Sequence, residues 1–202
     1  ITLSVGAKER AMALKHLRLS SGSQTFGINA RPIPQIRIEV PQYWSLVGQE
    51  NPWLSIKGHF GYGYFTDGDW QKSYAAAGKQ HADGTLLHTK AGYLKIGNPE
   101  RFPLVFEGGL EMAAQFGGTI YNPWSRIGQY ADKIEMGQGV KDFVDVIFGL
   151  GSDETDGAYK NASGNLLGSW LFSLTYHAKD WSLRAYYDHY FEDHSMMFFE
   201  CP

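Results

Sequence analysis

Two carboxylates stand out in the longest alternating stretch of the chain, PLVFEGGLEMAAQFGGTI at residues 103–120. Glu107 and Glu111 are four residues apart, which in a strand places them about 13 to 14 Å from each other. The two carboxyl groups of a glycosidase are only about 5 to 10 Å apart. We therefore predict that these glutamates are not a catalytic pair. We expect one face of this strand to line a polar interior, with Glu107, Glu111, Gln115 and Thr119 on that face.

A second group of reactive side chains lies near the end of the chain. Asp188, His189, Glu192 and His194 follow one another closely, and Ser195 comes next. Alternation along a strand separates His189 from Asp188 and Glu192, whereas a metal needs ligands that converge. The same alternation separates His194 from Ser195, so a nucleophile and its base would not meet. We predict no metal site, no cofactor and no enzymatic activity.

Aromatic rings and hydrogen-bonding groups suited to a carbohydrate lie in the connection after Ile120 and in the last strand. The candidate polysaccharide-binding residues are Tyr121, Trp124, Arg126, Asp188, Tyr190 and Glu192. The basic side chains of Arg126, Lys133 and Lys141 would suit an anionic polymer.

The elements that must position these side chains are strands with a two-residue period. In residues 103–120 the even positions are apolar or glycine, and the run is longer than the about 5 to 6 residues of an ordinary strand. A tilted strand that crosses a bilayer needs about 9 to 11 residues. Similar alternation occurs at residues 1–7, 19–40, 53–65, 86–97, 166–178 and 181–191, with Pro32 and Pro34 interrupting the second of these.

The connections between these strands differ greatly in length. Residues 97–103 and the pair Lys179 and Asp180 are short turns, whereas residues 66–84 and 121–165 are long loops. Apolar residues at helical spacing predict one short helix near residues 139–149 inside the second long loop. Outer-membrane barrels have short periplasmic turns and long outer loops. This rule would place both long loops outside the cell.

The composition agrees with a membrane barrel and excludes some other classes. The chain has 202 residues, 43% of them hydrophobic, with 24 Gly, 12 Tyr, 12 Phe and 6 Trp. No apolar run is long enough for a membrane helix. A net charge of −3 lacks the excess of basic residues that is typical of a nucleic-acid-binding protein. The single cysteine, Cys201, cannot form an internal disulfide.

Several segments resemble the capsule assembly Wzi family as found in Bacteroidetes. They are KGHFGYGYFTDG at residues 57–68, EGGLEMAAQFGG at 107–118, KDFVDVIFGLGSDE at 141–154 and LGSWLFSLTYHAKDWSLRAYYDHYFEDHSMMF at 167–198. Residues 20–38 are similar to the earlier strands of the same family. The resemblance covers most of the chain in the expected order.

The resemblance implies a monomeric barrel of the bacterial outer membrane, with about 18 strands, that binds capsular polysaccharide and helps attach it to the cell. We expect this chain to be an internal fragment, a single partial domain over residues 1–202 with about 7 to 8 of those strands. Its partners would be the polymer and outer-membrane lipid. A porin-like channel for small solutes and a soluble β-sandwich are the alternatives. An inward-folded loop at residues 121–165 would close the lumen and favour polysaccharide binding over conduction.

Overall fold

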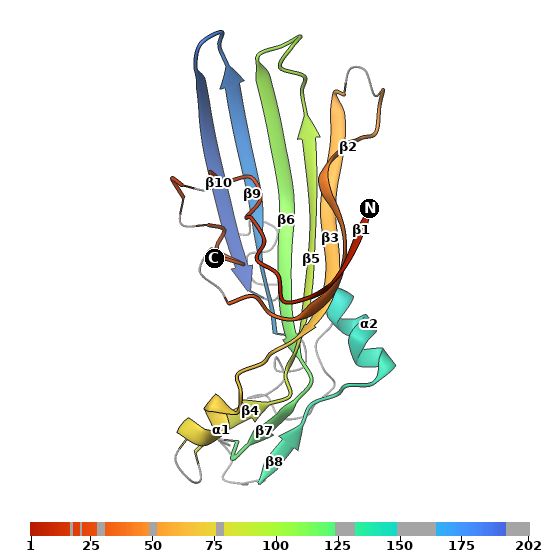
Figure 1. Ribbon diagram of the computed structural model, residues 1–202, viewed down its shortest axis with the longest axis vertical. Helices are drawn as coiled ribbons and strands as arrows, with labels where there is room; N and C mark the ends of the chain where they lie inside the picture. The colour runs from red at the N-terminus through yellow and green to blue at the C-terminus, as the bar shows by residue number, and fades with distance from the viewer. Residues whose placement is uncertain are drawn as a thin grey trace.

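The chain folds mainly into one large antiparallel sheet. The computed structural model describes residues 1–16, 18–20, 22–27, 31–48, 52–75, 79–123, 132–148 and 165–192. The seven strands follow the order β1-β2-β3-β5-β6-β9-β10 (Figure 1). They are β1 (Thr2–Gly6), β2 (Gln35–Ser45), β3 (Leu54–Tyr64), β5 (Leu86–Ile96), β6 (Leu104–Phe116), β9 (Asn165–His177) and β10 (Ser182–Glu192). Within the described residues, β1 and β10 are the open edges of this sheet.

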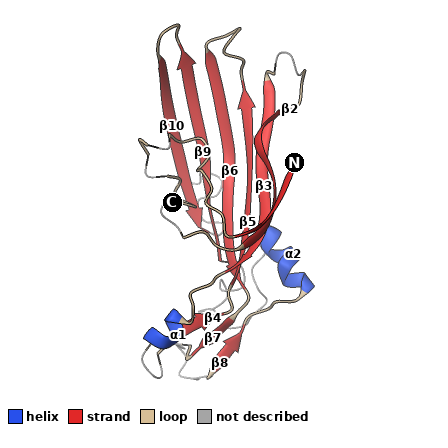
Figure 2. Cartoon of the chain, viewed as in Figure 1, coloured by secondary structure: helices blue, strands red, loops and turns tan. Residues whose placement is uncertain are grey.

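A smaller sheet and two helices lie beyond or beside the end of the large sheet that is opposite its short turns (Figure 2). The small sheet has the order β4-β7-β8. Its strands are β4 (His81–Asp83), β7 (Thr119–Tyr121) and β8 (Lys133–Glu135), and the helices are α1 (Trp70–Tyr74) and α2 (Val140–Phe148). No helix in the described part of the chain is long and apolar enough to cross a membrane.

The strands predicted from alternation at residues 53–65 and 86–97 are confirmed as β3 and β5, and α2 confirms the helix in the second long loop. The predicted hairpin at the end of the chain is also confirmed. The amide of Ala178 donates to the carbonyl of Trp181 at 2.8 Å, and Tyr176 lies opposite Leu183. The two apolar rows of this hairpin therefore share one face.

The prediction of a single strand over residues 103–120 is wrong at its far end. β6 stops at Phe116, and the following Gly117 and Gly118 have φ angles of 64° and 83°. A Cβ atom at Gly118 would lie only 2.7 Å from the carbonyl oxygen of Asp83, so this close approach of two backbones needs glycine. The chain turns here, and the polar residue Thr119 lies in β7, in the small sheet.

Two other predictions from the first half of the chain also need correction. The described part of residues 19–34 contains no strand, and β2 instead begins at Gln35, directly after the two prolines. β2 continues through Pro41 to Ser45 because a bulge between Val40 and Trp44 absorbs the proline. The loop predicted at residues 66–84 contains α1 and β4, so the described chain has two helices rather than one.

The register of the strands divides the large sheet into two faces of opposite character. We call one the polar face; among its residues are Arg37, Lys57, His59, Tyr93, Glu107, Glu111, Ser169, Ser173, Arg184 and Asp188. We call the other the apolar face; among its residues are Leu3, Ile38, Trp44, Ile56, Leu94, Phe106, Leu174, Tyr176 and Leu183.

Helix α2 packs on the apolar face where that face carries polar groups. Its Val146 is 1% exposed and belongs to a core cluster with Met112, Ala114, Phe116, Leu166 and Phe191. The hydroxyl of Tyr62 donates to the carbonyl of Phe143 at 2.7 Å, and the ammonium of Lys90 donates to the carbonyl of Ile147. α2 thus covers one end of the apolar face. It is held there by apolar packing and by hydrogen bonds from side chains of the sheet to backbone carbonyls of the helix.

We expect Tyr62→Phe to loosen α2, because it removes one of these hydrogen bonds, at a cost of about 1 kcal/mol. Hydrogen exchange of the α2 amides should become faster. Tyr64→Phe is the matched control on the same strand, since that tyrosine is 45% exposed. Equal exchange in both variants would contradict this account of how α2 is held.

Candidate functional site

The polar face of the large sheet is covered by the chain between β1 and β2. We call its described residues 7–16, 18–20 and 22–27 the inner segment. Figure 1 shows this stretch, in red and orange, crossing the middle of the sheet. The ammonium of Lys15 contacts Asp188 at 2.6 Å, and the hydroxyl of Thr25 lies 2.8 Å from that of Ser169. These contacts join the start of the chain to β9 and β10, more than 140 residues away.

The Lys15–Asp188 ion pair is the strongest of these anchors because both side chains are largely removed from water. Their side chains are 13% and 9% exposed. The same Asp188 oxygen also accepts from the backbone amide of Gln24 at 3.3 Å. A buried pair of this kind is costly to break, because the remaining charge loses its partner.

An apolar contact holds the middle of the inner segment. Leu14 is 5% exposed and packs with Tyr93 and Leu171 of the polar face. Its φ angle of 58° lies in the left-handed region, which is rare for a residue other than glycine or asparagine. The contact with the sheet holds Leu14 in this conformation.

Both predicted glutamates of β6 lie on the polar face and have partners there. Glu111 is 1% exposed and accepts a hydrogen bond from the hydroxyl of Tyr93. Glu107 forms an ion pair with Arg184 and accepts a hydrogen bond from Ser173 at 3.2 Å. The carboxylates therefore tie β6 to β5, β9 and β10.

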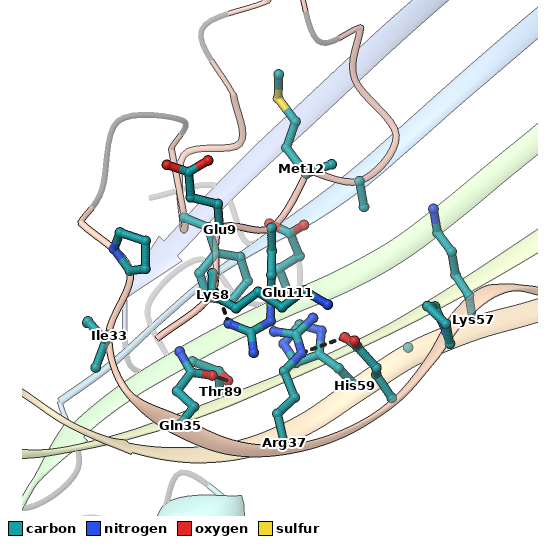
Figure 3. A pocket seen from close by; sticks show the side chains of 18 of the residues that line it. Lys8, Glu9, Met12, Ile33, Gln35, Arg37, Lys57, His59, Thr89 and Glu111 are labelled. Carbon is teal, nitrogen blue, oxygen red and sulfur yellow. Dashed lines mark hydrogen bonds and ion pairs between the residues drawn. The ribbon is translucent and has the colours of Figure 1, made fainter. Parts of the chain in front are cut away.

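A cavity of about 510 Å³ lies between the inner segment and the polar face. Its sheet wall comes from β2, β3, β5 and β6, and Figure 3 shows Arg37 and His59 next to each other on that wall. Arg37 donates to Glu39 at 2.8 Å. On the other wall, Arg10 of the inner segment donates to the carbonyl of Lys8 at 3.0 Å.

Basic groups outnumber carboxylates around this cavity. The basic side chains are Lys8, Arg10, Arg31, Arg37 and Lys57, and the acidic ones are Glu9, Glu39 and Glu111. Lys57 also lies over the rings of Tyr43 and Tyr93, at 4.6 and 5.1 Å from their centres. The cavity is therefore a net basic space of the size of a small-molecule site, about 300 to 1,000 Å³.

The structure separates the four residues predicted to line an interior. Glu107, Glu111 and Gln115 share the polar face, with Glu111 buried and Gln115 exposed. Thr119 belongs to the small sheet and lies apart from them in β7.

The candidate polysaccharide-binding residues do not gather at one place in the described structure. Tyr121 stacks on His81 in the small sheet, with ring centres 5.0 Å apart. Asp188 forms an ion pair with Lys15. Tyr190 and Glu192 lie on the same face of β10 and are exposed. Trp124 and Arg126 lie outside the described residues, as do His194 and Ser195.

The two other basic candidates have acidic partners on the surface. Lys133 pairs with Glu135 at 2.5 Å, and Lys141 pairs with Asp145 at 3.7 Å. In the part of the chain that is described, no three His, Cys, Asp or Glu side chains gather in a way that could hold a metal. His189 lies on the opposite face of β10 from Asp188, as alternation predicted.

Sequence reasoning missed the inner segment and the cavity beneath it. Arg37, His59 and Tyr93 could have been placed on one face from the two-residue period of their strands. Lys15 and Arg10 could not, because they lie in a stretch that has no period. Comparisons with protein-family models, with curated proteins and with solved structures gave no match for this chain.

We expect Lys15→Met to release the inner segment from β10. The variant leaves Asp188 without its buried partner, so the free energy of unfolding should fall by about 3 kcal/mol. Tryptic cleavage after Arg18 should become faster under native conditions.

Lys133→Met is the matched control, because the side chains of the Lys133–Glu135 pair are 56% and 68% exposed. Water screens the attraction within an exposed pair, so this substitution should leave the free energy of unfolding nearly unchanged. Equal effects of the two substitutions on cleavage after Arg18 would refute the anchoring role of Lys15.

Proposed function

We propose that this chain forms part of the wall of a bacterial outer-membrane β-barrel that retains capsular polysaccharide at the cell surface and catalyses no reaction. The observation that carries the proposal is the arrangement of the two faces of the large sheet. The middle of the polar face is covered, with Glu111 at 1% exposure, while Leu183 on the apolar face is 66% exposed. A water-soluble sheet buries its apolar side instead.

The exposed apolar surface is broad enough to need a partner. It includes Leu3, Val5, Ile36, Ile38, Leu94, Ile96, Phe106, Leu174 and Leu183. Large contiguous apolar patches on soluble proteins mark interaction sites. The strands beneath this patch, β3, β5, β6, β9 and β10, have 11 to 13 residues, enough for the about 9 to 11 that a tilted bilayer-crossing strand requires.

Aromatic side chains cluster at the end of the sheet that has the short turns. Trp44, Trp53, Phe102, Tyr176 and Trp181 are between 39% and 60% exposed. Aromatic belts of this kind are typical of the level of the lipid headgroups. Together with the long connections at the other end, the belt favours a periplasmic position for the short turns.

The covered polar face favours retention of a polymer over conduction through an open pore. Helix α2, on which the sequence argument relied to close the lumen, packs on the apolar face. The inner segment takes that place instead, held by Lys15 and Leu14. The resemblance of residues 167–198 to the capsule assembly Wzi family supplies the identity of the polymer as capsular polysaccharide.

We expect an arginine on the apolar face to impair membrane insertion. Leu94→Arg places a charge on the exposed band two residues before the end of β5. The cost of an arginine rises from about 0 to 1 kcal/mol near the interface to about 2 to 4 kcal/mol at the bilayer centre. Thr2→Arg is the control on the polar face, where the new side chain would lie opposite Glu39. The fraction of full-length protein that assembles into liposomes should fall for Leu94→Arg alone. Equal assembly of both variants would show that this face does not meet lipid.

The functional part of the proposal is tested in encapsulated cells that lack the gene. We expect such cells to shed capsule into the medium, and the full-length protein to restore its attachment. In planar bilayers the purified protein should show no large open channel, because the inner segment fills the interior. Firmly attached capsule in the deletion strain would sink the polysaccharide role, and large steady conductance would favour the porin-like alternative.

A further inference from the structure

We propose that the cavity beneath the inner segment binds a carboxylate-bearing sugar, so that the polymer is recognised through a uronic acid unit. The identity of the ligand as a sugar unit rests on the proposed function. The preference for a carboxylate rests on the cavity itself and can be tested independently of the proposed function.

Two nitrogen atoms on facing walls of the cavity are buried without a hydrogen-bond partner. One is Nε of Arg10 in the inner segment, and the other is Nε2 of His59 in β3. One carboxyl oxygen of Glu111, Oε2, also lines the cavity and is buried without a partner. Almost all buried polar groups in proteins are hydrogen-bonded, so three such atoms in one cavity call for a ligand or water. A carboxylate offers two acceptor oxygens, one for each of these nitrogens.

The charges around these atoms favour an anion. Burial, and then the positive charges of Arg37 and Arg10, lower the pKa of His59, and the two arginines also repel each other. Glu39 is paired with Arg37. One oxygen of Glu111 accepts from Tyr93, and its Oε2 is free to accept from a sugar hydroxyl. Burial raises the pKa of Glu111, which favours its neutral form. An incoming carboxylate would offset the remaining positive charge, and hydrogen bonds to charged groups are about twice as strong as neutral ones.

The rest of the lining fits the body of a sugar ring. Phe26 lies against His59, with ring centres 5.9 Å apart, and Met12 and Leu87 contribute further apolar surface. Gln35 and Thr89 supply hydrogen-bonding groups, and Figure 3 shows both at the base of the cavity. The exposed residues Lys8, Glu9 and Arg31 mark the edge where the cavity meets solvent.

The test is titration of the purified protein with sodium glucuronate, followed by calorimetry and by the NMR signal of His59 in histidine-labelled protein. Glucose is the neutral counterpart of the same ring, acetate the carboxylate without a ring, and inorganic phosphate a different anion. We expect glucuronate to bind at least about tenfold more tightly than each of these, and to shift the His59 signal.

Arg10→Gln and His59→Gln should each weaken glucuronate binding at least about tenfold, and both change one wall of the cavity only. Arg101→Gln is the matched control, because Arg101 is exposed in the turn between β5 and β6. Circular dichroism and tryptic cleavage after Arg18 report whether each variant keeps its fold and its inner segment in place.

Equal binding of glucose and glucuronate would overturn the carboxylate preference, and equal binding of phosphate or acetate would overturn recognition of a sugar acid. Glucuronate binding that is unchanged in both cavity variants would overturn the site. Failure of the proposed function looks different. In that case, glucuronate still binds through Arg10 and His59, but cells without the gene keep their capsule.

Discussion

A carboxylate buried against a sheet must have partners, and much of this molecule follows from that constraint. Glu111 is 1% exposed in the middle of β6, and an unpaired buried charge costs several kcal/mol. Tyr93 supplies a donor from the neighbouring strand, and the inner segment supplies the cover. The ion pair of Lys15 with Asp188 fixes that cover. The inner segment therefore keeps the middle of the polar face out of contact with water.

On the apolar face, some polar side chains are covered and many apolar ones are exposed. Two of its polar residues, His88 and Lys90, lie where α2 covers the sheet, and His88 is 1% exposed there. The ring of Tyr62 contacts both His88 and Phe143, so the helix and the sheet share one aromatic cluster. Away from α2, side chains such as Leu94 and Leu174 are exposed. The middle of the polar face is thus covered within the described chain, while most of the apolar face stays exposed.

These two faces connect the proposed membrane position with the proposed ligand. A sheet with lipid on one side can keep arginines and histidine on its other side, where the inner segment leaves a cavity between Arg10 and Arg37. The inner segment therefore both covers the middle of the polar face and forms one wall of the cavity. A change that releases Lys15 would then alter both this cover and the cavity.

The local sequence pattern predicted many of the strands, because the two-residue alternation of a strand can be recognised in consecutive residues. The period at β3, β5 and β6, and the two-residue turn before β10, determined which side chains share a face, including Glu107 and Glu111. The glycine pair that ends β6 was misjudged, since Gly117 and Gly118 fit an alternating pattern until the approach of Asp83 is known. Only the tertiary structure placed Arg10 and Lys15 over the sheet and α2 on the apolar face. Those contacts join residues more than 50 positions apart, and no local period encodes such pairings.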